Sequence, residues 1–141
     1  MVRRIYIDGI WDCYHMGHVL HLKEIKNLDN KNNYLIVGII SDKEATSYKR
    51  EPIYNESHRK ILIESCKYVD KIIEKPPLII TEEFLKKHKI DLVCHGFSNL
   101  SDCNKQGAFF KIPIKLNIFR PVKYHKGIST TDIIKKIKNN Y

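Results

Sequence analysis

Short apolar runs alternate with a segment of helical periodicity in the first part of the chain. Residues 4–7 have the pattern of a short buried strand, and residues 17–28 repeat their apolar positions at helical spacing. Residues 34–40 form a nearly continuous run rich in β-branched side chains, which is typical of a strand covered on both faces of a parallel sheet. Strand, helix and strand in this order predict a βαβ unit.

The same alternation continues after this unit. Asn55 is a suitable N-cap for a helix that runs to about residue 67, and Thr81 is suitable for a helix that runs to residue 87. A short strand is predicted after each of these helices, at residues 71–73 and at residues 91–94. Each predicted helix is therefore followed by a predicted strand.

The last third of the chain has a less regular pattern. Residues 96–111 show no clear period and predict a loop, whereas the apolar run at residues 114–119 predicts a final strand. The hydroxyl residues 129–131 can cap a closing helix that runs to about residue 138. Helices that alternate with strands predict an α/β fold: a doubly wound parallel sheet with helices on both faces and ligands at the carboxyl ends of its strands.

Length and composition narrow the functional class. The 141 residues contain no linker or internal repeat, so a single domain over residues 1–141 is expected. No apolar run approaches a membrane span and the N-terminus does not resemble a signal peptide, so a cytoplasmic protein without stable membrane insertion is expected. The four cysteines are scattered without a CxxC pair, which favours reduced thiols over a disulfide framework or a zinc site.

The formal net charge of +9 raises the question of nucleic-acid binding. The basic residues, however, are spread along the whole chain rather than gathered in one segment. A positive field attracts a nucleoside triphosphate and a phosphorylated substrate equally well. An RNA-binding module is therefore the weakest of the functional hypotheses, and no nucleic-acid partner is expected.

The most specific feature is the segment 8–18, DGIWDCYHMGH, between the first strand and the first helix. It places two imidazoles, His15 and His18, at a helix entrance, where free N–H groups and the helix dipole favour anions. Histidines in this position can donate hydrogen bonds to phosphate oxygens as negative charge grows. Alone, the pair also fits solvated histidines, core histidines or a metal pair, although no third zinc ligand has a convincing spacing.

Two motifs of the chain together resemble the cytidylyltransferases of the HxGH nucleotidyltransferase superfamily. The first motif is His15-Met16-Gly17-His18, and the second, RTxGISTT in its usual form, is matched by Gly127-Ile128-Ser129-Thr130-Thr131. Lys49, Arg59 and the segments 68–70 and 91–96 also look like segments of this family, so the resemblance covers nearly the whole chain. It implies a Rossmann-like fold.

The resemblance also implies a set of site residues. The catalytic group is His15 and His18, which contact the triphosphate and stabilise the transition state, with Lys49 as a phosphate ligand. The implied nucleotide-binding residues are Gly9, Ile10, Trp11, Arg59, His95, Gly127, Ile128, Ser129, Thr130 and Thr131, and the implied substrate-binding residues are Asp12 and Tyr124. Ordinary alternatives remain at single positions: a surface lysine at 49, an arginine at 59 that covers its helix, and hydroxyls at 129–131 that only cap.

The implied reaction is the transfer of CMP from CTP to a small phosphomonoester, with release of pyrophosphate. Such transfer depends mainly on positioning and charge stabilisation. A phosphomonoester is largely ionised at neutral pH, because its second pKa is about 6, so the nucleophile needs no dedicated base. Mg²⁺ is the expected cofactor, held by phosphate oxygens and water, and the resemblance implies a homodimer or a tandem pseudo-dimer.

Two positions depart from the family pattern. Tyr124-His125 stands where the second motif begins with Arg-Thr, and Arg50 stands where a glycine usually follows the phosphate-binding lysine. A missing arginine removes a bidentate phosphate partner that a lysine does not fully replace. This departure leaves open a catalytically impaired nucleotide-binding half of a tandem enzyme.

The choice of substrates is less determined by the sequence. The pair His95-Gly96 is similar to the corresponding residues of the phosphoethanolamine cytidylyltransferases. The positions that are aromatic and acidic in the phosphocholine enzymes are occupied in this chain by Pro77-Leu78 and Gly96-Phe97. The expected order of acceptors is therefore phosphoethanolamine, then phosphocholine, then glycerol 3-phosphate. ATP remains an alternative to CTP, because relatives with the HxGH motif also use ATP.

Overall fold

The centre of the protein is a parallel β-sheet of five strands, seen in a computed structural model that describes residues 1–123 and 128–141. The strand order is β3-β2-β1-β4-β5, and every neighbouring pair is parallel. The strands are β1 (Arg3–Gly9), β2 (Asn33–Ile39), β3 (Lys71–Glu74), β4 (Leu92–His95) and β5 (Phe119–Pro121). The order reverses between β1 and β4, which is the switch point where doubly wound folds bind ligands.

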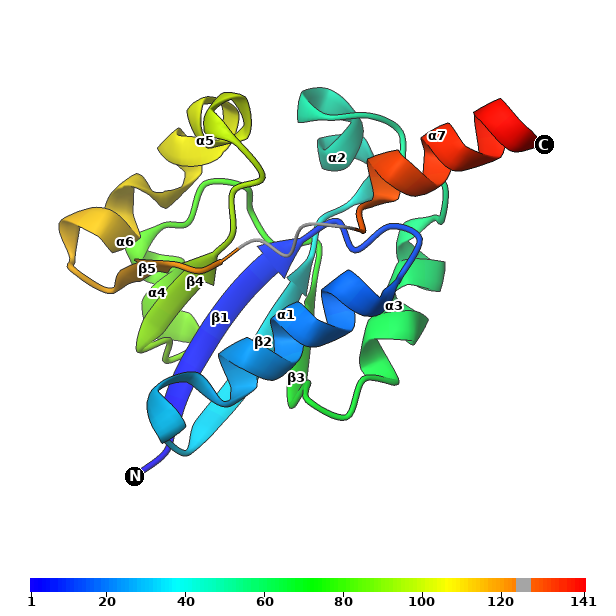
Figure 1. The fold of residues 1–141 in the computed structure, drawn as a ribbon. Coiled ribbons are helices and arrows are strands. Elements are labelled where there is room, and N and C mark those ends of the chain that lie inside the picture. The colour runs from blue at the N-terminus through cyan, green and yellow to red at the C-terminus, as the bar shows by residue number, and fades with distance from the viewer. Residues whose placement is uncertain (124–127) are drawn as a thin grey trace.

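Helices cover both faces of this sheet (Figure 1). Helices α1 (Met16–Lys26) and α3 (Glu56–Glu64) pack on one face, where β1 contributes Ile5 and Ile7. Helix α4 (Glu82–Lys87) and the 3₁₀ helix η2 (Gly107–Phe110) pack on the other face, where β1 contributes Tyr6. Successive side chains of a strand point to opposite faces, so one buried strand supplies both cores. The predicted α/β fold is confirmed.

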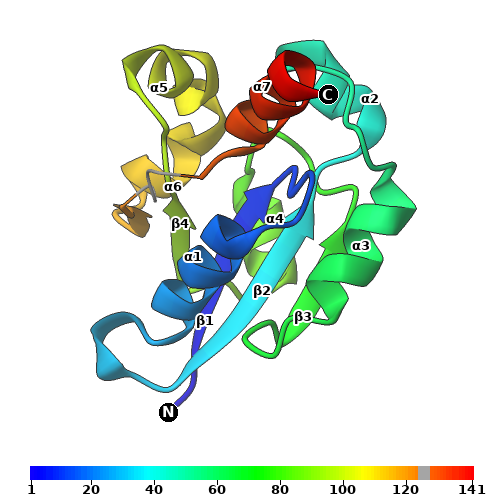
Figure 2. The ribbon, with the colours of Figure 1, turned by 45° about the vertical axis from the view of Figure 1, so that its right-hand side comes forward.

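Three further helices gather at the carboxyl end of the sheet, opposite the N-terminus of the chain (Figures 1 and 2). They are α2 (Asp42–Tyr48), α5 (Leu100–Gln106) and α7 (Thr130–Asn140). Elsewhere, α6 (Lys111–Lys115) follows η2 beside β5, and the short η1 (Leu28–Asn30) follows α1. Within the described ranges, no helix is both long enough and apolar enough to cross a bilayer. The strand ends, α2, α5 and α7 therefore surround one region of the molecule.

Side-chain caps set the beginnings of several helices. Asn55 accepts a hydrogen bond from His58 N at 2.8 Å, and Thr81 accepts one from Phe84 N at 3.1 Å. Ser129 accepts one from Asp132 N at 3.0 Å. These bonds satisfy backbone donors that a helix leaves free in its first turn, and they confirm the three predicted caps. Helix α3 ends at Glu64, before the predicted end at residue 67.

The segment after β4 differs from the prediction. Residues 96–111, predicted as a loop, contain α5 and η2, and the predicted strand at residues 114–119 is wrong because α6 occupies Lys111–Lys115 and β5 begins only at Phe119. Proline is tolerated in the first turn of a helix, where its missing N–H has no partner to lose, so Pro113 fits within α6. The apolar run does not form one buried strand, because Ile114 and Leu116 are exposed.

Candidate active site

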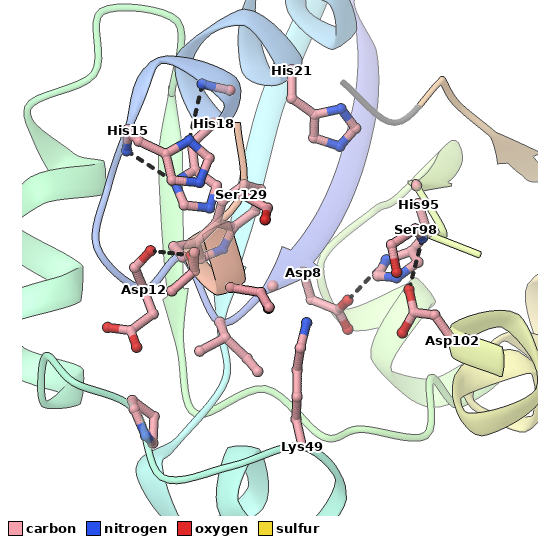
Figure 3. A pocket seen from close by; sticks show the side chains of 18 of the residues that line it. Asp8, Asp12, His15, His18, His21, Lys49, His95, Ser98, Asp102 and Ser129 are labelled. Carbon is pink, nitrogen blue, oxygen red and sulfur yellow. Dashed lines mark hydrogen bonds and ion pairs between the residues drawn. The ribbon is translucent and has the colours of Figure 1, made fainter. Parts of the chain in front are cut away.

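A pocket opens at the carboxyl ends of β1 and β4, where the first loop of the chain meets α2, α5 and α7 (Figure 3). Its walls contain His15, His18 and Lys49 together with residues 128–131. The two motifs that are far apart in the sequence therefore share one site. Of the other predicted residues, the pocket is lined by Gly9, Ile10, Trp11, Asp12 and His95, whereas Tyr124 and Gly127 lie outside the described residues.

The two histidines of the first motif form a reciprocal cap at the start of α1. His15 is the N-cap, and its Nδ1 accepts a hydrogen bond from Gly17 N at 3.0 Å. His18 is the third residue of the helix, and its Nδ1 accepts a hydrogen bond from His15 N at 3.2 Å. This is the geometry of a capping box, built here from imidazoles. Because both Nδ1 atoms accept hydrogen bonds, each neutral ring has its proton on Nε2, which is left as a donor.

The glycine between the histidines is required by space. A Cβ atom on Gly17 would lie 2.8 Å from the His15 ring and 3.1 Å from Cγ2 of Ile128. The two imidazoles stack at 3.8 Å between ring centroids, and the rings of Trp11 and His18 meet in a T-shaped contact at 5.6 Å between centroids. The HxGH spacing thus fixes two rings in contact and lets the C-terminal motif approach them. A side chain at position 17 would separate the two parts of the site.

Both imidazoles are uncharged in the free protein at neutral pH. Burial, together with the neighbouring His15, His21 and Lys49, lowers the pKa of His18 to about 3. Burial also lowers the pKa of His15. The free pocket therefore contains neutral N–H donors whose protonation a bound anion would favour.

The start of α7 joins the pocket through hydroxyl groups. The Thr130 hydroxyl donates to the carbonyl oxygen of Asp12 at 2.9 Å, which ties α7 to the loop before the histidines. Nη1 of Arg50 donates to Oγ1 of Thr131 at 3.3 Å. Capping by Ser129 and binding of an anion both use the free backbone N–H groups in the first turn of α7, so the two roles are compatible. A guanidinium group from the loop after α2 thus lies at the entrance of α7, at a position that sequence reasoning treated only as a departure.

Lys49 follows α2 and lines the same pocket. Burial by the pocket walls lowers the pKa of Lys49 although part of the residue is open to solvent, Asp102 partly offsets this, and the Arg50 and Lys105 charges lower it further. An ammonium group in such surroundings gains from an anionic ligand. Lys49, Arg50 and the end of α7 make this side of the pocket a site for anions.

The wall of the pocket at the ends of β1 and β4 contains carboxyl groups, and Lys49 points toward it (Figure 3). Asp8 at the end of β1 and His95 at the end of β4 are buried, with Asp8 Oδ1 at 3.6 Å from His95 Nδ1 (Figure 3). Burial raises the pKa of Asp8 to about 7 and lowers that of His95 to about 4. Asp102 of α5 lies next to this pair and is half-buried. Sequence reasoning missed Asp8 and Asp102; the position of Asp8 at a strand end was the only available signal.

Comparison with known proteins shows the family of the chain that forms this pocket. A sequence model described as Cytidylyltransferase-like matches residues 6–136. The chain belongs to the cytidylyltransferase-like family. Choline-phosphate cytidylyltransferase A of Rattus norvegicus is 38% identical over 138 residues, which are 98% of this chain and 37% of that protein. Ethanolamine-phosphate cytidylyltransferase of Dictyostelium discoideum is 33% identical over 139 residues, which are 96% of this chain and 38% of that protein.

A solved structure is similar to this chain in its fold. The lipopolysaccharide core biosynthesis protein from Thermoplasma volcanium GSS1 superposes with a TM-score of 0.64 at 27% identity, over 89% of this chain and 98% of that chain. This cytidylyltransferase-like chain spans 37% to 38% of the length of the two curated relatives. The predicted family is confirmed.

Asp12 of the cytidylyltransferase-like site has a different environment from the one expected of a substrate ligand. Its Oδ2 accepts a hydrogen bond from Ile53 N at 2.7 Å, and its Oδ1 accepts one from Tyr54 N at 2.9 Å and another from Cys13 N at 3.1 Å. Both carboxylate oxygens are thus engaged by the backbone, although the residue lines the pocket. Asp12 therefore holds two loops together at the pocket wall, and its contact with a substrate stays a prediction.

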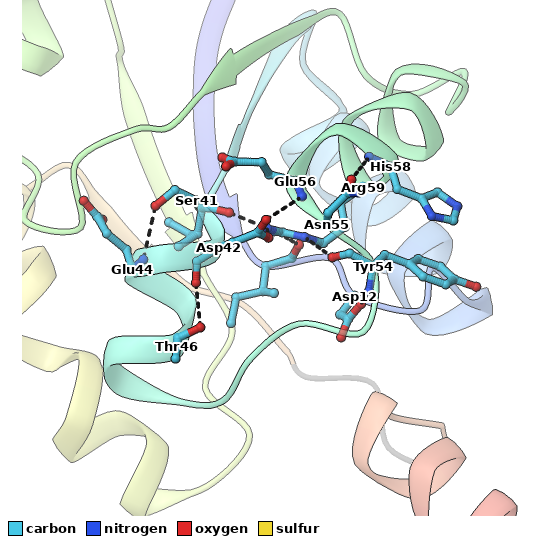
Figure 4. Close-up of polar contacts among 12 residues, drawn as sticks. Asp12, Ser41, Asp42, Glu44, Thr46, Tyr54, Asn55, Glu56, His58 and Arg59 are labelled. Atoms are coloured by element: carbon cyan, nitrogen blue, oxygen red, sulfur yellow. Dashed lines mark hydrogen bonds and ion pairs between the residues drawn. The ribbon is translucent and has the colours of Figure 1, made fainter.

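Arg59 also supports the cytidylyltransferase-like pocket from outside. Its side chain is fully buried and does not line the pocket. Its Nη1 donates to the carbonyl oxygens of Ile10 at 2.7 Å and Ile40 at 2.8 Å (Figure 4). Its Nε donates to Tyr54 O at 3.0 Å, and its Nη2 pairs with Asp42 Oδ1 at 2.6 Å. Arg59 thus braces the loops that form the pocket from beneath, and its contact with the nucleotide stays a prediction.

Trp11 and Gly9 place the backbone of the first loop in the cytidylyltransferase-like site. The Trp11 indole Nε1 donates to Gly38 O at 3.0 Å, and the residue has a positive φ of 60°. A Cβ atom on Gly9 would lie 2.7 Å from the Trp11 ring. The indole is therefore a structural anchor, while the backbone of residues 9–11 forms part of the pocket wall.

Proposed function

We propose that this chain transfers the cytidylyl group of CTP to a small phosphoalcohol, giving a CDP-alcohol and pyrophosphate. The observation that supports it most strongly is the convergence of the Nε2–H groups of His15 and His18 with Lys49 and the start of α7 on one pocket. The relatives are named choline-phosphate cytidylyltransferase and ethanolamine-phosphate cytidylyltransferase, which supports CTP over ATP and an amino-alcohol phosphate as acceptor.

The chemistry assigned to the pocket is an in-line substitution. A phosphate oxygen of the acceptor forms a bond to the α-phosphorus of CTP, and the bond from that phosphorus to the oxygen bridging to the β-phosphate breaks, so the electron pair leaves with pyrophosphate. The acceptor oxygen is already ionised, so no base has to remove a proton. The Nε2–H groups of His15 and His18 stabilise the charge that grows on the phosphates, and Lys49 neutralises the leaving pyrophosphate.

Mg²⁺ belongs to this proposal as a companion of CTP. Residues 1–123 and 128–141 contain no cluster of three His, Cys, Asp or Glu side chains with metal-ligand geometry. Both oxygens of Asp12 are already engaged by backbone N–H groups. The donor set therefore fits an ion held by phosphate oxygens and water, which is how Mg²⁺ usually accompanies nucleotides. The ion would add positive charge to the phosphate groups.

An active enzyme is proposed in preference to an impaired nucleotide-binding half. Arg50 places a guanidinium group at Thr131, so the anion side of the pocket has an arginine in spite of the unusual start of the second motif. Guanidinium groups are the preferred bidentate partners of phosphate. A homodimer remains a proposal that rests on the sequence resemblance, and a cytoplasmic location remains a proposal that rests on the apolar pattern and the N-terminal residues of the sequence.

The proposal predicts pyrophosphate release that depends on both CTP and an acceptor. We expect turnover with Mg²⁺, CTP and either phosphoethanolamine or phosphocholine, and a higher melting temperature in the presence of CTP than of ATP. Labelled CTP with each acceptor, followed by separation of the CDP-alcohol, measures the first result. Binding of CTP without pyrophosphate release, with every acceptor, would identify an impaired nucleotide-binding half instead.

The histidines predict a proton uptake when CTP binds. In the free protein the pKa of His18 is about 3, so its imidazole is uncharged near neutral pH. A triphosphate beside the ring raises this pKa, so the complex binds more protons than the free protein wherever the pH lies between the two pKa values, and CTP affinity increases as the pH falls through the pKa of the complex. Titration calorimetry in two buffers of different ionisation enthalpy measures the uptake. Substitution His18→Asn should reduce it; equal uptake in both proteins would exclude His18 as the group that titrates.

A further inference from the structure

One arginine at the wall of the pocket has no acidic partner. Arg50 comes two residues after the end of α2, lines the pocket and is half-buried. Its Nη1 donates to Oγ1 of Thr131 at 3.3 Å. In the part of the chain that the structure describes, no carboxylate forms an ion pair with its guanidinium group, whereas Arg3, Arg59 and Arg120 each pair with an aspartate. A guanidinium group in a pocket wall without a carboxylate is available to an anionic ligand.

The surroundings of Arg50 favour an anion as well. Lys49 precedes it and lines the same pocket, and its pKa is lowered first by burial and then further by the Arg50 charge, although Asp102 raises it. The start of α7 adds backbone donors. Ser129 caps the amide of Asp132, so the amides of the first two residues of this helix have no acceptor within it. Two like charges and a helix start therefore face one point, where a bound anion would relieve the repulsion between the charges.

The charge distribution of a nucleoside triphosphate indicates which phosphates belong at this point. The β- and γ-phosphates carry most of the negative charge, and they leave together as pyrophosphate in the proposed reaction. The greatest density of positive charge in the pocket is therefore expected next to them. A guanidinium group has five N–H donors in a rigid fork, so the bond from Arg50 to Thr131 leaves donors for phosphate oxygens.

We infer that Arg50 binds the β- and γ-phosphates of CTP and holds pyrophosphate as it leaves. This inference rests on the proposed function and adds a phosphate-binding residue at a position where the family pattern has a glycine. Tyr124 stands where the second motif usually begins with an arginine. Arg50 brings a guanidinium group to the start of α7 from the segment after α2, which is 81 residues away from Thr131 in the chain. The departure at position 50 thus compensates for the departure at position 124.

The test compares CTP with CMP, which lacks the two phosphates in question. In Arg50→Ala, we expect the Kd for CTP, measured by titration calorimetry with Mg²⁺, to rise by about tenfold or more, because hydrogen bonds between charged groups are lost. The Kd for CMP should stay within about twofold of the wild-type value. Arg50→Lys keeps the charge but not the fork, so its CTP affinity should lie between those of the wild type and the alanine variant. In turnover assays, the inhibition constant for pyrophosphate should rise together with the Kd for CTP.

The control is Lys43→Ala, which removes the same charge from a residue that is exposed on α2 and does not line the pocket. Its Kd for CTP should stay within about twofold of the wild-type value. Without ligand, the Arg50 and Lys43 variants should both keep the wild-type melting temperature, because the hydrogen bond from Arg50 to Thr131 is exposed.

Three results would overturn the inference: wild-type CTP affinity in Arg50→Ala, an equal loss of CMP and CTP affinity in that variant, or an equal loss of CTP affinity in Lys43→Ala. A wild type that binds CTP through Arg50 and releases no pyrophosphate with any acceptor would instead refute the proposed function. The binding and turnover measurements therefore distinguish the two failures.

Discussion

Replacing His18 with alanine is expected to lower turnover by about a hundredfold or more, because it removes a donor aimed at the charge that grows on the phosphates. The backbone amide of His15 fixes the ring by donating to Nδ1, which leaves Nε2–H for the triphosphate. His15 has the same arrangement through Gly17 N, so His15→Ala is expected to have a comparable effect. Steady-state assays of pyrophosphate release measure both losses.

The alanine variant also loses a helix cap, which costs about 0.5–2 kcal/mol of stability. His18→Asn separates the two effects, because an asparagine oxygen can accept from the His15 amide but cannot take the place of the Nε2–H donor. We expect this variant to keep the wild-type urea midpoint and still to lose turnover. His58→Ala is the matched control, since His58 is exposed on α3 and stacks on Tyr54 away from the pocket. Near-normal turnover of both His15 and His18 variants would remove the proposed roles.

Replacing Arg59 with methionine is expected to lower the free energy of unfolding by about 3 kcal/mol or more, because it leaves three backbone carbonyl oxygens without their buried donor, each at a cost of about 1–3 kcal/mol. The guanidinium group satisfies three carbonyl oxygens, those of Ile10, Ile40 and Tyr54, and pairs with the Asp42 carboxylate. Methionine fills a similar volume without donating any hydrogen bond. Urea denaturation followed by tryptophan fluorescence measures the change, since Trp11 lies next to Ile10 in the same loop.

A neighbouring ion pair offers the comparison for Arg59. Lys60 on the same helix pairs with Glu74 at 3.4 Å, with 38% and 63% of the side chains exposed, so Lys60→Met should change stability by less than about 1 kcal/mol. If Arg59→Met instead kept the wild-type stability and lost only CTP affinity, Arg59 would act through the nucleotide. That result would restore the role that the family resemblance implies.

Local sequence was sufficient for much of the fold because the features involved depend on neighbouring residues. The run from Tyr34 to Ile40 lies in β2 and the residue that follows it, and both faces of this strand are buried. The nearly continuous run of β-branched side chains was enough to predict this. Asn55, Thr81 and Ser129 begin helices because each side chain bonds the amide three residues later. The segment after β4 could not be predicted in this way, because α5 and α6 are short and their apolar residues are partly exposed.

For the candidate site, the sequence by itself singled out His15, His18, Lys49 and residues 128–131, which the structure brings to one pocket. The spacing of His15, Gly17 and His18 encodes a local cap whose geometry follows from helix periodicity. Only the tertiary structure decided what Asp12 and Arg59 do, because their partners lie 41 or 42 and 19 or 49 residues away in the chain. It also brought Asp102 of α5 to the Asp8–His95 pair at the ends of β1 and β4. Such pairings depend on how distant segments pack, and no local pattern of charge or periodicity records them.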